Sequence, residues 1–157
     1  MINFKENTIL PSPTEALIES VEKFSRVKFP SSYKNFIINF NGIVPIDNEF
    51  LYDGHEYAIE RFLSLLGDEV NNFKEGWSDI EVIITEIGER LAVDEEQLGD
   101  VLIPIAVLFA GDYVCLDFRN NEVEPTVCIW YHEQSAPFQP VTNKIANSFD
   151  EFLNMLK

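Results

Sequence analysis

The sequence VKFPSSYKNFIINFNG, residues 27–42, predicts a short helix with clear boundaries on both sides. Phe29-Pro30 indicates an extended entry, because a residue that precedes proline is disfavoured in the α region. Ser31 or Ser32 can then cap the helix. Asn41-Gly42 ends it, since Gly42 can adopt the left-handed conformation of a C-cap. The apolar residues fall at i, i+3, i+4 and i+7, which is one face of a helix, and they are Tyr33, Phe36, Ile37 and Phe40.

Three further helices are predicted from a shared start signal. Residues 12–15, 78–81 and 148–151 each place a serine three positions before a glutamate, as in a capping box, and in the first of them a proline follows the serine. Apolar residues at helical spacing follow each start, so each helix must pack one face on another element. These residues are Leu17, Ile18, Val21 and Phe24 in the first helix, Ile80, Ile83, Ile84, Ile87 and Leu91 in the second, and Phe149, Phe152, Leu153 and Leu156 in the last.

The strands are predicted between these helices. Segments 57–66, 102–108, 113–118 and 126–131 are rich in apolar and β-branched residues, and 48–52 and 139–141 are candidate edge strands. Pro104 suits an edge strand or a first strand position, because proline lacks a backbone N–H. Helices at both ends and grouped strands between them favour an α+β fold, with a mainly antiparallel sheet of about five to six strands and helices packed on one side. The length of 157 residues indicates one domain, residues 1–157.

The charge of the chain is strongly negative and unevenly placed. Lys and Arg number 11 and Asp and Glu 27, which gives a net charge of −16. Residues 41–133 hold 4 basic and 21 acidic residues, whereas the segments before and after them are close to neutral. Such a field repels nucleic acid and anionic membranes and attracts basic partners. The alternative explanation is a general charge that maintains solubility.

Four motifs, taken in order, identify a family resemblance. FPSSYKNFIINFNG is followed by IPIAVLFAGDYVCLDF (Ile103–Phe118), then by VCIWYHE (Val127–Glu133) and IANSFDEFLNML (Ile145–Leu156). Together they resemble the SUKH superfamily, the Smi/Knr-type group. In that group a helix with a glutamate, here Glu22, precedes the Phe-Pro-x-x-Tyr helix. The resemblance covers about residues 12–45 and 100–157, and the motifs do not extend over about 46–99.

This resemblance implies a fold and a function. The fold is α+β, and most bacterial members are immunity proteins that bind and neutralise a polymorphic toxin, often a nuclease. The chain is therefore expected to be a bacterial antitoxin that acts by protein–protein interaction, without an enzymatic activity or a cofactor. Eukaryotic relatives act in signalling and cell-wall regulation, so an intracellular scaffold or regulatory module that binds a protein is the alternative.

Two acidic clusters are the candidate surface for a basic protein partner. The first lies after the Asn-Gly helix end and comprises Asp47, Glu49, Asp53 and Glu56 with Tyr52 and Tyr57 among them. The second, Asp94, Glu95, Glu96 and Asp100, lies in the polar segment 93–100. An aromatic ring that fills a pocket within a charged rim is typical of a binding hot spot. The alternative is a solvated face whose aromatic rings turn into the core.

Catalytic and metal sites are not indicated. His55 and His132 are the only histidines and stand in no recognisable triad motif. Glu49 to Glu60 imitates the spacing of an EF-hand loop, but Leu51 occupies a ligand position, so we interpret the match as accidental. Cys115 and Cys128 are expected to face each other across a hairpin as reduced, buried thiols. No apolar stretch is long enough to span a membrane and no secretory signal is evident, so a cytoplasmic location is expected.

Overall fold

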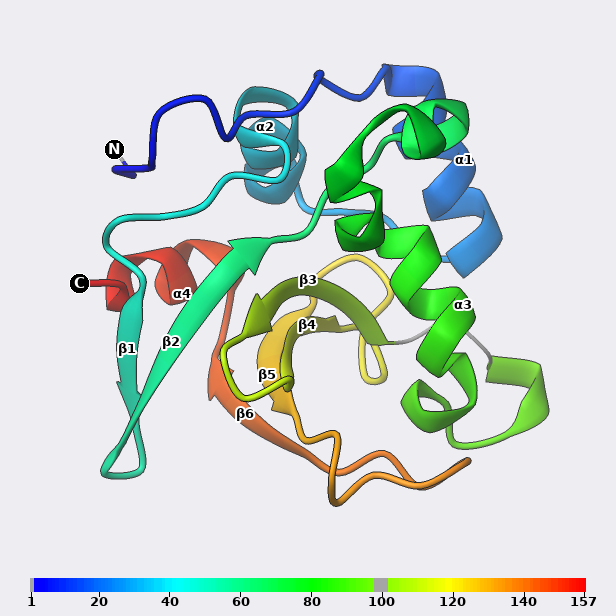
Figure 1. Cartoon of the computed structure of the whole chain (residues 1–157). Coiled ribbons are helices and arrows are strands. Elements are labelled where there is room, and N and C mark those ends of the chain that lie inside the picture. The colour runs from blue at the N-terminus through cyan, green and yellow to red at the C-terminus, as the bar shows by residue number, and fades with distance from the viewer. Residues whose placement is uncertain (1, 98–101) are drawn as a thin grey trace.

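The structure, a computed structural model, describes residues 2–97 and 102–157 (Figure 1). Residues in 3-10 helices are labelled η. The elements in chain order are α1 (Glu15–Ser25), α2 (Ser31–Phe40), β1 (Glu49–Tyr52), β2 (His55–Phe62), η1 (Gly67–Asn72), η2 (Lys74–Ser78), α3 (Ile80–Leu91), η3 (Glu95–Gln97), β3 (Leu102–Leu108), β4 (Tyr113–Asp117), β5 (Thr126–Trp130), β6 (Thr142–Ala146) and α4 (Phe149–Met155).

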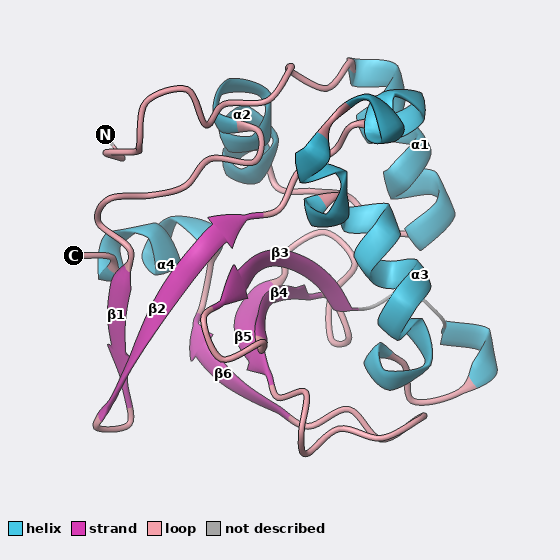
Figure 2. Ribbon diagram, viewed as in Figure 1, coloured by secondary structure: helices cyan, strands magenta, loops and turns pink. Residues whose placement is uncertain are grey.

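The strands form one antiparallel sheet of six strands, in the order β1-β2-β3-β4-β5-β6. Each strand therefore pairs with the next one along the chain, and the sheet is strongly twisted (Figure 2). The predicted α+β fold with a mainly antiparallel sheet of five to six strands is confirmed. The first and last strands are β1 and β6, and α3 is the helical insertion between β2 and β3.

Two strand predictions were wrong. Residues 139–141 form no strand, and the edge strand β6 begins at Thr142. Pro104 lies in β3, which is an inner strand with β2 on one side and β4 on the other. The proline is tolerated there because the ladder with β2 begins only at Ala106, and the register with β4 shifts between Pro104 and Ala106.

The helices cover the sheet on both faces. Because neighbouring strand residues point to opposite faces, Val114 and Ile129 join the main core, which also contains the apolar residues of α1, α2 and α4. Cys115, Cys128 and Trp130 point the other way and pack with Leu91 of α3. The expectation of helices on one side holds for α1, α2 and α4, and the C-terminal half of α3 in addition covers the second face.

Helix α2 has the C-terminal boundary and the apolar face that its sequence predicts. Phe36 packs its ring 4.8 Å from that of Phe62 in β2 and 5.2 Å from that of Phe149 in α4. The serine cap is wrong, because Pro30 occupies the N-cap position and no side chain caps the helix. Gly42 has φ +70°, as expected for the helix end. A Cβ atom at Gly42 would lie 2.7 Å from Leu10 Cδ1, so the tight packing there also requires glycine.

Asn41 joins three segments of the chain. Its fully buried side chain donates from Nδ2 to the carbonyl oxygens of Pro11 (2.7 Å) and Leu65 (3.0 Å). Its Oδ1 accepts a hydrogen bond from the Leu65 backbone N–H at 2.9 Å. The amide therefore satisfies polar backbone groups that have no strand or helix partner, and it fixes the end of α2 against the chain before α1 and the chain after β2.

Two of the three predicted serine caps were also wrong. Thr14, and not Ser12, caps α1 by accepting from the Leu17 backbone N–H. Asp79 caps α3, because its Oδ1 accepts from two backbone N–H groups of the first turn while Oδ2 accepts from the Leu66 N–H. Ser148 caps α4 as predicted. An aspartate has two oxygens, so Asp79 can cap the helix and bind the segment after β2 at once, which a serine could not do.

Glu22 is a buried carboxylate with a structural role. Its side chain is 2% exposed, its Oε2 accepts from the Phe29 backbone N–H at 2.7 Å, and Lys34 Nζ lies 3.4 Å from the same oxygen. The Phe29 N–H belongs to the extended entry before Pro30 and has no helical partner. Glu22 thereby ties α1 to the start of α2, which explains why a glutamate accompanies the Phe-Pro-x-x-Tyr helix in this sequence.

The two cysteines lie where the hairpin prediction placed them. Cys115 of β4 is directly opposite Cys128 of β5, and both are free and buried. Burial, followed by the neighbouring Cys128 thiol, raises the pKa of Cys115, so it stays a neutral thiol. Trp130 is fully buried beside them. None of the described helices is long and apolar enough to cross a membrane.

Asn41→Ala tests the role of the Asn41 amide. The substitution leaves the Leu65 N–H without its acceptor, and the unfolding free energy should fall by about 3 kcal/mol, since each lost or orphaned buried hydrogen bond contributes about 1 kcal/mol or more. Urea unfolding measures the change. Asn39→Ala is the matched control, because the Asn39 amide is exposed and binds only the Asn35 carbonyl of its own helix. Equal, small effects of the two substitutions would contradict the assignment.

Candidate protein-binding surface

The first predicted cluster lies on and beside the β1–β2 hairpin, at the lower left of Figure 1. The strands are joined by Asp53 and Gly54, which both have positive φ (51° and 78°), as in a two-residue type I′ turn. Asp-Gly is favoured there because this turn requires left-handed backbone at both positions. Asp53 thus lies at the tip of the hairpin, and Glu49 and Glu56 lie on its strands rather than in a loop.

The residues of this cluster divide between the two faces of the hairpin. Phe50 is fully buried and stacks on Tyr57, its partner in the register, at 5.4 Å, so this face points inward. Tyr52 shares the inward face, because it is two residues after Phe50. Glu49 and Glu56 lie on the outward face. The structure therefore does not bring Tyr52 and these two carboxylates into one patch.

The outward face has an apolar residue that the sequence interpretation missed. Leu51 pairs with Glu56 in the register and is 53% exposed, with Glu49 on the same face. The signal was present in the alternation of β1, since residues next to the buried Phe50 must point outward. Leu51, and not Tyr52, is therefore the apolar residue that lies among these carboxylates.

Asp47 and Glu49 are fixed by neighbouring segments. Asp47 Oδ2 accepts a hydrogen bond from Asn3 Nδ2 at 2.8 Å and is half-buried. The backbone of Glu49 exchanges two hydrogen bonds with Lys157, at 3.1 and 2.9 Å. These bonds occupy part of the outer edge of β1, which would otherwise present unpaired backbone groups.

The second predicted cluster lies far from the first. Asp94, Glu95 and Glu96 are exposed after α3, at the lower right of Figure 1, across the molecule from the β1–β2 hairpin. The Glu96 backbone N–H donates to Asp94 Oδ1 at 2.9 Å, which begins the short helix η3. Asp100 lies outside the described residues. The described residues of the two clusters therefore do not form one continuous surface.

The basic residues of the acidic middle segment are mostly engaged inside the protein. Arg90 donates to the carbonyl oxygens of His132 and Ser135 and lies over the Trp130 ring, 5.1 Å from its centroid. Arg61 is half-buried, and burial lowers the pKa of its guanidinium. Lys74 and Arg119 are the exposed ones among the four basic residues of 41–133, and Arg119 pairs with Asp117. The carboxylates of this segment therefore face solvent largely without compensation.

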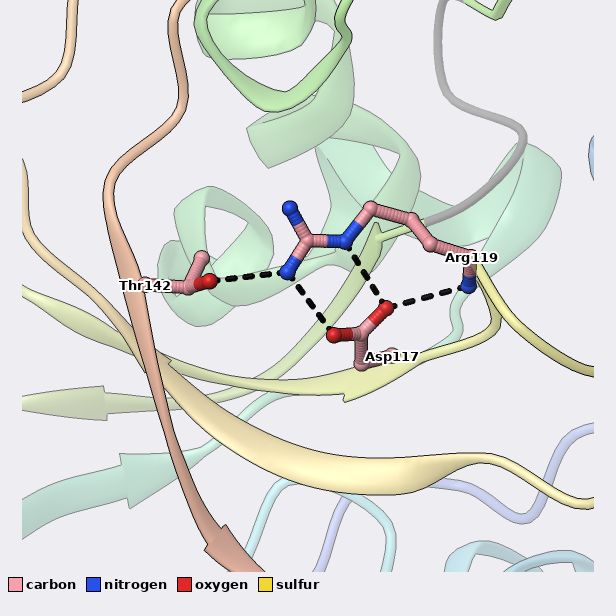
Figure 3. Close-up of polar contacts among 3 residues, drawn as sticks. All are labelled: Asp117, Arg119 and Thr142. Atoms are coloured by element: carbon pink, nitrogen blue, oxygen red, sulfur yellow. Dashed lines mark hydrogen bonds and ion pairs between the residues drawn. The ribbon is translucent and has the colours of Figure 1, made fainter.

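Arg119 is held by Asp117 (Figure 3). Asp117 accepts from Arg119 Nε at 2.9 Å and from Nη2 at 2.8 Å, and Nη2 also donates to Thr142 Oγ1 at 2.7 Å. The hydrogen bond to Asp117 raises the pKa of Arg119. Asp117 Oδ1 also accepts from the Arg119 backbone N–H at 3.0 Å, so the carboxylate binds both the backbone and the side chain of Arg119. The group joins the β4–β5 loop to β6 and leaves no free cation there.

The structure offers no support for a metal-binding loop at residues 49–60. These residues form the strands and turn of a hairpin, whereas an EF-hand loop requires a helix on each side. Across the part of the chain that the structure describes, no group of three or more His, Cys, Asp or Glu residues is arranged to hold a metal ion.

Comparison with known protein families gives a match. The family model SUKH_6, described as SMI1-KNR4 cell-wall, matches residues 15–153. The match extends through residues 46–99, where the motifs of the sequence do not reach. No curated protein matches the chain.

The raised pKa of the Tyr57 phenol predicts that the stability of the folded protein depends on pH. The Tyr57 and Tyr131 hydroxyls lie 3.4 Å apart, and this hydrogen bond, with burial, raises the pKa of Tyr57 to about 12. The folded state favours the neutral Tyr57 phenol. The hydrogen bond of this phenol therefore stabilises the fold fully below the unfolded pKa of 10.0, and this stabilisation is lost as the pH rises through the folded pKa of about 12. In Tyr131→Phe, the Tyr57 pKa should move back toward 10.0 and this loss should shrink.

Ultraviolet titration of phenolate absorbance, with urea unfolding at each pH, measures both effects. Tyr52→Phe is the control, because Tyr52 acts on Tyr57 only through a weak charge interaction. A Tyr57 titration unchanged in Tyr131→Phe would show that the hydrogen bond does not set its pKa.

Proposed function

The chain belongs to the SMI1-KNR4 family, which confirms the SUKH resemblance, and from this membership we propose that it is an immunity protein. In this proposal it binds a basic polymorphic toxin, a nuclease in the simplest case, and neutralises it without catalysing a reaction. The protein acts in the cytoplasm of a bacterial cell. Direct protein–protein contact is the mechanism, so no cofactor is required.

The observation that carries the proposal is the uncompensated negative charge of residues 41–133. A nuclease must present cations to the phosphates of its substrate, so an acidic protein can occupy the same groove and exclude nucleic acid. Charge complementarity also accelerates association, by factors of about 10 to 1,000. An immunity protein must bind before the toxin acts, and fast association meets that need.

The binding residues in this proposal are the two acidic clusters. They comprise Asp47, Glu49, Asp53 and Glu56 on the hairpin side, without Tyr52, which lies on the inward face, and Asp94, Glu95, Glu96 and Asp100 after α3. The outward face of the hairpin is the stronger of the two candidates. It combines the exposed Leu51 with Glu49 and Glu56 on paired strands, which hold the side chains in fixed positions.

Co-expression with the product of a neighbouring gene tests the function. If that gene encodes a large, multidomain protein with a toxic C-terminal region, growth of cells that express the toxic region should be restored by this protein. The two proteins should also co-purify. A neighbour of another kind, with no growth defect to restore, would favour the alternative of a scaffold or regulatory module that binds a protein.

Charge reversal tests the surface. Glu49→Lys combined with Glu56→Lys should slow association with the toxin by about tenfold and weaken its dependence on salt, because steering charges act on the association rate. Stopped-flow fluorescence measures both quantities. Glu95→Lys with Glu96→Lys tests the second cluster in the same way.

Glu122→Lys with Glu124→Lys is the matched control, since it changes the net charge equally on exposed residues of the β4–β5 loop. If this control slows association as much as the hairpin variant does, the hairpin is not the binding surface.

A further inference from the structure

A groove lies between α1 and α3, on the right of Figure 1, far from the β1–β2 hairpin. Its lining includes Glu89 and Arg90, which shortly precede the second acidic cluster at Asp94. Its volume is about 490 Å³, and its apolar lining comes from both helices. The residues that bear on the argument are Val21, Phe24 and Ser25 of α1 and Ile84, Ile87 and Glu86 of α3. A second hollow, which shares Glu81 and Glu86, continues the groove along α3 toward η1. The groove is large enough to take several side chains of a partner.

The rim of the groove is acidic. Glu81, Glu86 and Glu89 line it from α3 and are exposed, and no ion pair between described residues involves any of them. Partial burial, followed by Asp79 and Asp68, raises the pKa of Glu81, which shows that carboxylates crowd at this end. The one basic residue of the lining, Arg90, has its guanidinium engaged with backbone carbonyls. A cationic partner would therefore gain attraction here without displacing an existing ion pair.

Phe24 is an apolar residue that the fold does not bury. The sequence places it on the apolar face of the first helix with Val21, yet in the structure it is 68% exposed and lines the groove. The buried stripe of α1 runs instead through Ile18, Val21, Glu22 and Ser25. Phe24 therefore stands beside the half-buried Ile84 and Ile87 of the groove without being covered. A large exposed ring at the margin of an apolar groove is typical of a protein-binding site.

Ser25 supplies an independent sign of a missing partner. Its side chain is 1% exposed and lines the groove, and its hydroxyl has no hydrogen-bond partner. Other helical hydroxyls of this protein, such as those of Ser20 and Thr85, bind a carbonyl one turn back. A buried hydroxyl without a partner is unfavourable, so a bound chain that offers a polar group to Ser25 would satisfy it.

We propose that the α1–α3 groove binds a segment of the partner protein in which apolar side chains are flanked by Lys or Arg, as on one face of a basic amphipathic helix. The apolar side chains pack on Phe24, Ile84 and Ile87, and the cations meet Glu86 and Glu89. This binding mode is that of a helix in an apolar groove. The inference rests on the proposed function as a protein-binding domain and specifies the chemistry of the partner.

A synthetic amphipathic peptide of Leu and Lys is the probe, and a matched peptide of Leu and Glu is its comparison. Fluorescence anisotropy should show saturable binding of the Leu/Lys peptide to the full chain and none of the Leu/Glu peptide. Phe24→Ser should weaken binding about tenfold, as expected for an interface residue of moderate importance. Glu86→Lys with Glu89→Lys should weaken it by at least as much and reduce its dependence on salt.

Two matched variants separate groove binding from general attraction to an acidic protein. Phe109 is 67% exposed, so Phe109→Ser removes an equally exposed ring elsewhere and should leave binding unchanged. Glu49→Lys with Glu56→Lys makes the same charge change on the hairpin and should also have little effect. Absence of Leu/Lys binding, or equal losses in the groove variants and these controls, would overturn the inference. The co-expression experiment tests the immunity function with the wild-type protein, and the peptide measurement needs no toxin, so either proposal can fail alone.

Discussion

The hydrogen bonds of one buried amide, that of Asn41, hold this fold together at the point where three segments of chain meet. They attach the end of α2 to the carbonyl of Pro11 and to both polar backbone groups of Leu65. Neither segment has a regular helix or strand partner there, so without the amide these groups would be buried and unsatisfied. The next residue, Gly42, packs closely against Leu10 and Ser64. The end of α2 thus fixes the position of the chain before α1 and of the chain after β2. The α1–α3 groove and the β1–β2 hairpin are positioned as a consequence.

The internal contacts of two arginines also affect the charge distribution on the surface. Arg90 is engaged with carbonyl oxygens under the second face of the sheet, and Arg119 is engaged with Asp117 and Thr142 at its edge. Each arginine stabilises a loop that would otherwise have free polar groups, so neither is available to pair with the other carboxylates of residues 41–133. These contacts leave the net charge unchanged, but few carboxylates of residues 41–133 have an ion-pair partner among the described residues. An acidic surface of this kind is what the proposed recognition of a basic partner requires.

Much of the fold was accessible from the sequence because short-range rules determine it. The apolar periodicity of α2, the Asn-Gly helix end, the Ser148 cap and the limits of β3 follow from the chemistry of adjacent residues. Predictions that failed involve contacts over long distances in the chain. Asp79, and not the predicted Ser78, caps α3: one carboxylate oxygen accepts from the first turn of the helix and the other from the Leu66 N–H. Pro104 is tolerated in the inner strand β3 because the ladder between β2 and β3 involves only residues from Ala106 onward.

The sequence by itself determined the α+β class, the order of the elements, the acidic middle segment and the family resemblance, because these depend on composition, periodicity and motif order. Only the tertiary structure decided which side chains share a surface. It placed Tyr52 on the inward face of the hairpin and Leu51 on the outward face, and it set the two acidic clusters at opposite sides of the molecule. It also left Phe24 uncovered beside α3, although its spacing predicted burial. The reason is that helical periodicity gives a direction around one helix axis, whereas exposure depends on which other elements reach that side.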